Sequence, residues 1–238
     1  MALNAFFPVY RSAKIFNCKP VELSLRSVFL PDSKVIYICN PKVAGSSIIQ
    51  SLLSIDPDAD ADIKADHNSP SSRRRISSLR DPKGFLDCIE DKDAFRFAFV
   101  RNPYTRVMSC FRDKIASGRA PRFRMQLGLP ENGEISLLEF LEKVSSQELA
   151  SMNRHWRPQS ALIPERIKLS FLGRFENLNA DLEILYQKIG VERSDIKTVD
   201  YHRTRTGNNI DLGDKEVKLI NMIYREDFSR FNYETISN

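Results

Sequence analysis

The sequence is poor in the residues that build metal centres and disulfide frameworks. It has only three histidines and four cysteines in 238 residues, and no two cysteines are spaced as a C-x-x-C pair. Cys39 lies in an apolar run and Cys110 in a helical pattern, so we expect reduced, mostly buried thiols in a reducing compartment. The aspartates of 56–67 alternate as in a calcium loop, but glycine is missing from the sixth position and His67 stands where the bidentate glutamate belongs. The sequence therefore predicts no bound metal.

Long apolar runs are also missing, and none approaches the length that crosses a membrane. The first twenty residues lack a basic leader followed by a long apolar core, so they do not resemble a secretory signal. They carry no acidic residue before Glu22, which leaves room for peripheral contact with a membrane surface. We expect residues 1–33 to be an N-terminal extension packed on the domain, and the protein to be cytoplasmic.

What is present is an ordinary globular composition, with 42% hydrophobic and 28% charged residues. Lysine and arginine exceed aspartate and glutamate by 36 to 31, a formal charge of +5 that suits an anionic ligand. The most basic stretch, "SSRRRISSLR" (71–80), predicts a solvated face or a surface that steers an acidic acceptor. No interleaved basic and aromatic residues form a platform for single-stranded nucleic acid, so we predict no nucleic-acid partner.

Short apolar runs alternate with helical patterns along the chain. The runs predict buried strands, and the patterns predict a helix after each strand and two more. The expected strands are 34–39, 94–100 and 167–175, and the expected helices are 46–55, 103–117, 135–144, 176–189 and 214–231. This alternation predicts one α/β domain, residues 34–238, with a P-loop-like parallel sheet flanked by helices.

The loop "NPKVAGSS" (40–47) directly follows the first strand and opens a helix that we expect to be capped by serine. Such a turn offers free backbone N–H groups and the positive end of a helix to an anion. Gly45 would allow a close approach, and Lys42 would reach over the bound group. An ATP-binding loop instead has its lysine immediately before a serine or threonine, which is not the order here.

The segment "RNPYTRVMSCFRDK" (101–114) follows the second strand, and its Asn102 and Pro103 predict the cap and the first position of a helix. Ligands of parallel α/β sheets bind beyond the carboxyl ends of the strands, which is where both segments lie. Arg101 and Ser109 together provide an arginine fork and a hydroxyl, which suit a phosphate monoester. Arg106 and Arg112 are expected to be surface charges or partners of nearby acids.

These two segments resemble the two cofactor-binding signatures of the carbohydrate sulfotransferases, in the branch that includes the chondroitin, dermatan and HNK-1 sulfotransferases and small bacterial relatives. The resemblance extends through "RHWRPQS" (154–160), "FLGRFENLNADLEIL" (171–185) and "IYREDFSRFNYE" (223–234). It implies the sulfotransferase fold and transfer of the sulfuryl group of 3′-phosphoadenosine-5′-phosphosulfate (PAPS) to a hydroxyl of a carbohydrate or glycoconjugate. No metal is implied.

The resemblance also implies which residues bind the donor. Lys42 would contact the oxygen that bridges sulfate and phosphate, and Arg101 with Ser109 would hold the 3′-phosphate. The expected donor contacts are Lys42, Val43, Ala44, Gly45, Ser46, Ser47, Arg101 and Ser109, together with Arg203 or its neighbour Arg205.

A base must accept the proton of the acceptor hydroxyl. His67 is the first candidate, because related enzymes often carry a catalytic histidine after the first loop and its helix; His155 and Glu176 are the others. His202 is expected to be a loop residue near the nucleotide.

Two other functions remain open to the sequence. A P-loop-type kinase or NTPase requires a lysine–Ser/Thr pair and an acidic Mg²⁺ ligand after a later strand, whereas the second strand here ends in Arg101. A non-enzymatic module that binds polyanions would explain the positive charge but not the spacing of the two segments. The identity of the acceptor is not encoded in any recognisable motif.

Overall fold

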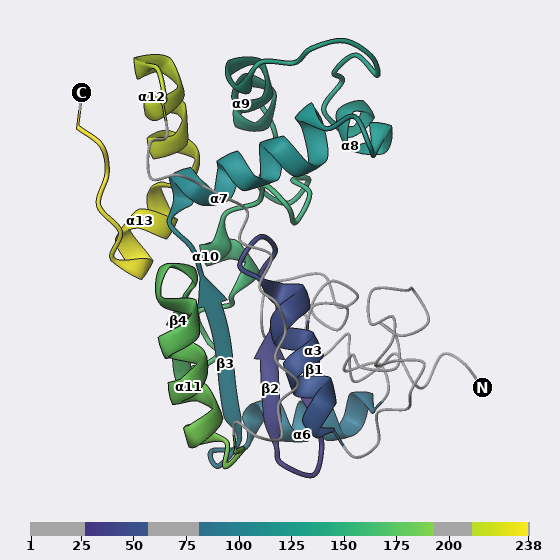
Figure 1. The fold of residues 1–238 in the computed structure, drawn as a ribbon, viewed down its shortest axis with the longest axis vertical. Helices are drawn as coiled ribbons and strands as arrows, with labels where there is room; N and C mark the ends of the chain where they lie inside the picture. The colour runs from purple at the N-terminus through teal and green to yellow at the C-terminus, as the bar shows by residue number, and fades with distance from the viewer. Residues whose placement is uncertain (1–26, 57–80, 193–210, 238) are drawn as a thin grey trace. The chain divides into compact units, whose positions relative to one another are not determined.

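The computed structural model describes residues 27–56, 81–192 and 211–237 (Figure 1). They fall into two units. The sheet unit takes its described residues from 27–100 and 163–192, and the helical unit takes them from 101–162 and 211–237. The predicted extension is described only from residue 27 onward, and most of the polar segment at 56–80 lies outside the described residues.

The described residues of the sheet unit form four strands in the order β1-β2-β3-β4. Their bounds are Ser27–Leu30 for β1, Val35–Ile38 for β2, Phe95–Val100 for β3 and Phe171–Arg174 for β4. Strands β2, β3 and β4 are parallel and confirm the three expected strands, while β1 pairs antiparallel with β2. The sequence analysis did not predict β1, because a four-residue apolar run gives no periodic signal of its own.

Helices cover both faces of this sheet because side chains alternate along each strand. Val28, Tyr37 and Phe97 belong to one apolar cluster with helices α3 (Gly45–Ile55) and α11 (Leu178–Lys188), which lie over the sheet in Figure 1. Phe29 faces the other way, and its ring meets Phe85 of α6 (Pro82–Glu90) edge-on with centroids 6.0 Å apart.

The third parallel strand approaches its neighbour closely at one glycine. A Cβ atom added to Gly173 of β4 would lie 2.3 Å from the Phe99 ring of β3. Only glycine fits there without moving that ring.

The helical unit is built around Trp156, which is fully buried. The Trp156 indole meets the rings of Phe123 and Phe140 edge-on, and its Nε1 donates a hydrogen bond of 2.9 Å to Gln147 Oε1. The helices of the unit are α7 (Pro103–Cys110), the π-helix η1 (Phe111–Ala116), α8 (Pro121–Gln126), α9 (Leu137–Ser145), α10 (Gln159–Leu162), α12 (Asp214–Ile223) and α13 (Arg225–Phe231).

The predicted closing helix, 214–231, is instead two helices that meet at Tyr224. Its backbone leaves the helical region, with φ −107° and ψ 21°, and its hydroxyl donates a hydrogen bond of 2.8 Å to the Trp156 carbonyl. Burial raises the pKa of the Tyr224 phenol, so the hydroxyl stays a neutral donor. The apolar spacing alone could not reveal this break. None of the helices in the described ranges has the length and apolar content to span a membrane.

Candidate functional site

The loop 40–47 leaves the sheet at the carboxyl end of β2. Ile38 of β2 lies opposite Ala98 of β3, so the loop starts beside the end of the neighbouring parallel strand. The Asn40 side chain is buried, and its Nδ2 donates a hydrogen bond of 3.1 Å to the carbonyl oxygen of Phe99. This bond fixes the start of the loop to β3.

Two residues of the loop adopt the left-handed conformation that L-residues rarely occupy. Lys42 has φ 72° and Ala44 has φ 62°, with the fully buried Val43 between them. Turns of this kind direct successive backbone N–H groups into a concavity that binds anions. Gly45 was expected to allow a close approach of the bound group, and the left-handed residues are its neighbours Lys42 and Ala44. A Cβ at Gly45 would meet Asn40 O and Tyr37 Oη at an ordinary 3.6 Å.

Helix α3 begins at Gly45 with Ala44 as its N-cap, and no side chain caps it. The expected serine cap is therefore not formed. The N–H groups of Ser47 and Ile48 bond to the Ala44 carbonyl at 3.0 and 3.1 Å. Ser46 is exposed and Ser47 is half-buried. Because the first N–H groups of a helix have no partner within it, this N-terminus can receive an anion.

Arg101 follows directly after β3 and belongs to the helical unit, where it is buried. Its Nε donates a hydrogen bond of 2.9 Å to Thr105 Oγ1. The Gln159 side chain bonds to both backbone groups of Arg101, at 2.9 Å to the N–H and 2.8 Å to the carbonyl oxygen. The next residue, Asn102, caps α7 by accepting from Tyr104 N at 3.0 Å, as the sequence predicts. Arg101 thus lies on a turn that is held by several hydrogen bonds.

Ser109 is half-buried on α7, and its hydroxyl bonds to no residue within the described part of the chain. Helix α7 continues into the π-helix η1, where the Ser117 N–H bonds to the Arg112 carbonyl at 3.2 Å. Single turns of π-helix inside α-helices are frequent at functional sites.

Arg106 is not the surface charge that the sequence analysis expected. It is buried, and its guanidinium donates to the carbonyl oxygens of Arg157 and Arg154 at 3.1 and 3.4 Å. Its role is to hold the 154–157 segment against α7. Arg112 is exposed, as expected, and the ion pair of Asp113 is made with Lys114 at 3.0 Å.

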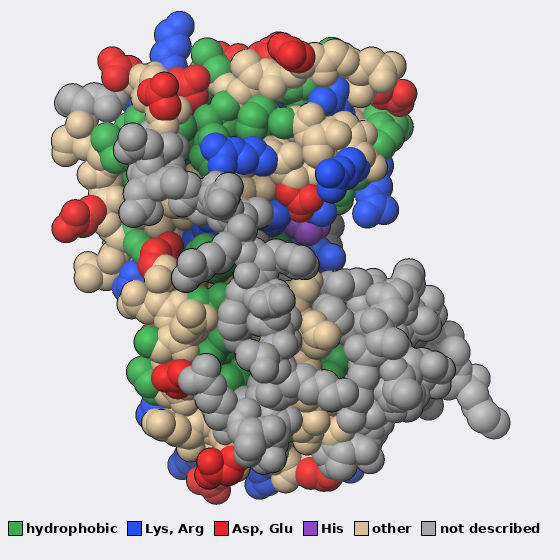
Figure 2. All heavy atoms as spheres, in the orientation of Figure 1, with side chains coloured by type: hydrophobic (Ala, Val, Ile, Leu, Met, Phe, Trp, Pro, Cys, Tyr) green, Lys and Arg blue, Asp and Glu red, His purple; other side chains and the backbone are tan. Residues whose placement is uncertain are grey.

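His155 is half-buried in the helical unit, and its ring meets the Phe123 ring edge-on with centroids 5.3 Å apart. Arg122 and Lys114 also lie over Phe123, at 5.0 and 5.4 Å from the ring centroid. Two basic side chains thus share the Phe123 ring with His155. Figure 2 shows basic and acidic side chains interspersed on the visible face of the helical unit. Glu176 is exposed in the turn before α11.

Several predicted site residues cannot be compared with the structure. His67, His202, Arg203 and Arg205 lie outside the described residues. Of the others, Lys42 to Ser47 belong to the sheet unit, whereas Arg101, Ser109 and His155 belong to the helical unit. Lys42 to Ser47 are consecutive residues of one loop, while Arg101 directly precedes α7, the helix that carries Ser109. The peptide bond from Val100 to Arg101 joins the two units along the chain.

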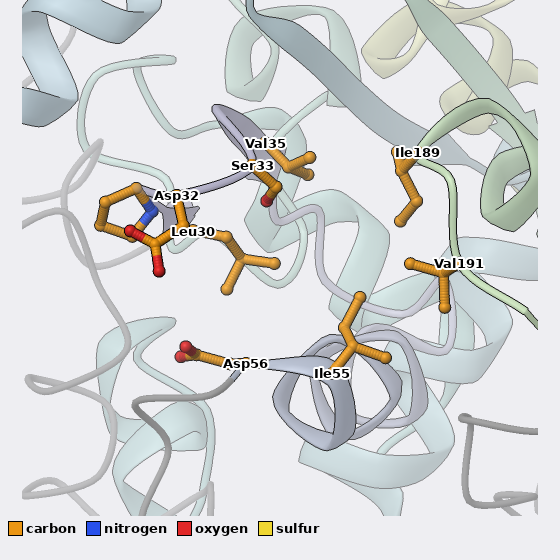
Figure 3. Close-up of a pocket in the computed structure, with 9 residues that line it drawn as sticks. Leu30, Asp32, Ser33, Val35, Ile55, Asp56, Ile189 and Val191 are labelled. Atoms are coloured by element: carbon orange, nitrogen blue, oxygen red, sulfur yellow. The ribbon is translucent and has the colours of Figure 1, made fainter.

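A pocket in the sheet unit lies at the end of β2 opposite the loop 40–47 (Figure 3). Its walls are mainly aliphatic, from Leu30, Ile55, Ile189 and their neighbours, and it also carries two carboxylates. Those carboxylates, on Asp32 and Asp56, make the pocket unsuitable for an anionic donor.

Comparison with known proteins shows which family the chain resembles. The model of the sulfotransferase family matches residues 26–234. The chain is 28% identical over 173 residues to carbohydrate sulfotransferase 14 of Mus musculus and of Homo sapiens, covering 66% of this chain and 45% of each relative. It is 26% identical over 230 residues to human carbohydrate sulfotransferase 9, covering 85% of this chain and 52% of that relative. The chain thus spans about half the length of these curated relatives, and no solved structure matches it.

Proposed function

The chain belongs to the sulfotransferase family, and on that premise we propose that it transfers a sulfuryl group from PAPS to a hydroxyl of a carbohydrate or glycoconjugate. The carbohydrate acceptor is suggested by the names of the relatives, which are carbohydrate sulfotransferases. The observation that carries the donor assignment is the loop 40–47, with left-handed Lys42 and Ala44 leading into the uncapped N-terminus of α3.

The loop fits the 5′-phosphosulfate end of such a donor. Backbone N–H groups from Ala44 to Ser46, with the hydroxyls of Ser46 and Ser47, hold the 5′-phosphate at the positive end of α3. The Ser47 N–H itself bonds to the Ala44 carbonyl. Val43, buried beneath the loop, keeps the left-handed residues on either side of it in place. Lys42 contacts the bridging oxygen and stabilises the negative charge that develops there.

The reaction is an in-line displacement at sulfur. The acceptor oxygen forms a bond to sulfur while the bond from sulfur to the bridging oxygen breaks, and 3′-phosphoadenosine-5′-phosphate leaves. The acceptor proton passes to a base, for which we propose His67 or His155. The chain contributes mainly positioning and electrostatic stabilisation.

Recognition of the 3′-phosphate distinguishes this donor from ATP. We propose that Arg101 and Ser109 bind it, with Arg203 as a further contact. The buried Arg101 guanidinium, oriented by Thr105, supports this role because a fixed fork suits a phosphate monoester.

We also propose that the protein works in a reducing, cytoplasmic setting. Cys39, Cys88 and Cys110, the cysteines within the described ranges, form no disulfide. Burial raises the pKa of the Cys88 thiol and so makes it less reactive. A thiol-specific reagent should titrate four thiols in the unfolded protein after isolation without reductant. Fewer than four thiols would contradict a reducing setting.

Calorimetric titration with 3′-phosphoadenosine-5′-phosphate tests the donor site directly. AMP and ATP, each with and without Mg²⁺, are the matched ligands. We expect binding that needs the 3′-phosphate and is unchanged by EDTA. Preference for Mg-ATP would instead favour a kinase or NTPase, and loss of all binding at moderate salt would favour a general polyanion binder.

A further inference from the structure

The backbone of Arg101 is held by a side chain far from it in sequence. Gln159 is fully buried, and its amide accepts from the Arg101 N–H at 2.9 Å and donates to the Arg101 carbonyl at 2.8 Å. One side-chain amide therefore pairs with both the backbone N–H and the backbone carbonyl of Arg101, as a neighbouring strand would. This pairing fixes where the Arg101 side chain leaves the main chain.

Gln159 is itself fixed by the buried carboxylate of Asp227 on α13. Asp227 Oδ2 accepts from the Gln159 N–H at 2.8 Å, and Oδ1 accepts from the Ser160 N–H at 2.7 Å. Arg230, one turn along the same helix, donates to the Ser160 carbonyl at 2.8 Å. Side chains of α13 thus bond to both N–H groups and to one carbonyl group at the start of α10.

We propose that Gln159, held by Asp227, is a positioning residue that orients Arg101 toward the 3′-phosphate of the donor. This inference rests on the proposed function. A guanidinium binds phosphate through a planar fork, so its affinity depends on the direction in which the side chain points. A small displacement of such a group weakens binding considerably. Buried residues that hydrogen-bond to a binding residue commonly prevent such displacements. The Nε bond to Thr105 further constrains the side chain.

The substitution Gln159→Glu tests this role with little change in volume. It replaces the Nε2 donor with an oxygen that faces the Arg101 carbonyl, so the bond to that carbonyl is lost while the Arg101 N–H keeps an acceptor. We expect the Kd for 3′-phosphoadenosine-5′-phosphate to rise about tenfold, with the Kd for AMP changed less than about twofold. In turnover assays, KM for PAPS should rise while kcat stays near that of the wild type.

Tyr224→Phe is the matched control, because it also removes a buried hydrogen bond to a backbone carbonyl in the helical unit. It should lower the melting temperature without changing the ratio of the Kd for AMP to the Kd for 3′-phosphoadenosine-5′-phosphate. Asp227→Asn is the second test variant, because it removes one of the two acceptors that bond to N–H groups of α10. It should also raise the Kd for 3′-phosphoadenosine-5′-phosphate. It keeps the inference testable if Gln159→Glu fails to fold.

A double-mutant cycle separates positioning from general damage. In an Arg101→Ala background, Gln159→Glu should have no further effect on the Kd for 3′-phosphoadenosine-5′-phosphate. Additive effects would overturn the inference, as would an unchanged Kd in Gln159→Glu when the wild type prefers the 3′-phosphorylated nucleotide. If the wild type binds this nucleotide no better than AMP, the proposed function fails, and the inference fails with it.

Discussion

Asn40 Nδ2 donates a hydrogen bond of 3.1 Å to the carbonyl oxygen of Phe99, in a site that is closed to solvent. The bond joins the loop after β2 to the last residues of β3. Strand β2 ends before it reaches the Phe99 carbonyl, so the Asn40 side chain makes the bond to it in place of a backbone N–H. The loop can therefore turn away from the sheet while the Phe99 carbonyl keeps a donor.

Asn40→Ala is expected to loosen the loop. It leaves the Phe99 carbonyl without this donor and should lower the free energy of unfolding by about 1–3 kcal/mol. Binding of 3′-phosphoadenosine-5′-phosphate should weaken as well, because the loop loses its fixed start. Urea denaturation and calorimetry measure the two effects. Ser54→Ala, which removes the bond from Ser54 Oγ to the Ser51 carbonyl near the far end of α3, is the control and should leave nucleotide affinity unchanged.

Lys42→Ala and Arg101→Ala should impair the enzyme in different ways. Lys42 acts on charge that develops during the reaction, so its loss should lower kcat by about a hundredfold or more with a smaller change in donor affinity. Loss of Arg101 should mainly raise the Kd for nucleotides that carry a 3′-phosphate. Steady-state kinetics and calorimetry on both variants separate the roles. An unchanged donor affinity in Arg101→Ala would refute the 3′-phosphate assignment.

Ala44→Gly should stabilise the protein. Ala44 has φ 62°, which costs an L-residue about 1–2 kcal/mol. Glycine removes this cost but loses more conformational entropy on folding, so the expected net gain is at most about 1 kcal/mol. Ala180→Gly, in the exposed face of α11, should instead destabilise by up to about 1 kcal/mol. A destabilising effect of Ala44→Gly in chemical denaturation would contradict the left-handed assignment.

The sequence was sufficient to predict the parallel strands and the cap at Asn102, because those features depend on local pattern. Buried strands require continuous apolar runs, and an Asn-Pro pair at a helix start has a local chemical cause. The two segments that follow β2 and β3 were found for the same reason.

The features that the sequence could not predict depend on contacts between distant residues. Arg106 resembles a surface charge until the carbonyl oxygens of Arg154 and Arg157 are placed around it. The break at Tyr224 needs the Trp156 carbonyl as a partner. Gln159 lies in a segment whose resemblance was noted, but only its bonds to Arg101, 58 residues away, reveal what its amide does.

The ion pair of Lys34 and Asp91 should give the sheet unit a pH-dependent stability. Lys34 Nζ lies 2.8 Å from Asp91 Oδ2, and this hydrogen bond lowers the pKa of Asp91 and raises that of Lys34. The contribution of Asp91 is therefore present above the ordinary carboxyl pKa and is lost as pH falls through its lowered value. The contribution of Lys34 is present below its ordinary pKa and is lost as pH rises through its raised value.

Lys34 is exposed and Asp91 is only half-buried, so the effect should be small and should shrink with added salt. Melting temperatures measured from neutral to acidic pH should fall less steeply in Asp91→Asn than in the wild type. Asp93→Asn, at an exposed neighbouring position, should retain the wild-type slope. Identical slopes for the wild type and Asp91→Asn would show that the pair does not contribute.

A histidine base predicts that kcat/KM for the acceptor falls at acidic pH, where the imidazole is protonated. Replacing the true base with glutamine should lower kcat by about a hundredfold or more and should remove this acidic limb. His67→Gln and His155→Gln are the two variants to compare. Because the His155 ring packs edge-on against Phe123, His155→Gln should also reduce stability, so its activity must be measured well below its melting temperature. If both variants keep the acidic limb, neither histidine is the base, and Glu176 becomes the residue to replace.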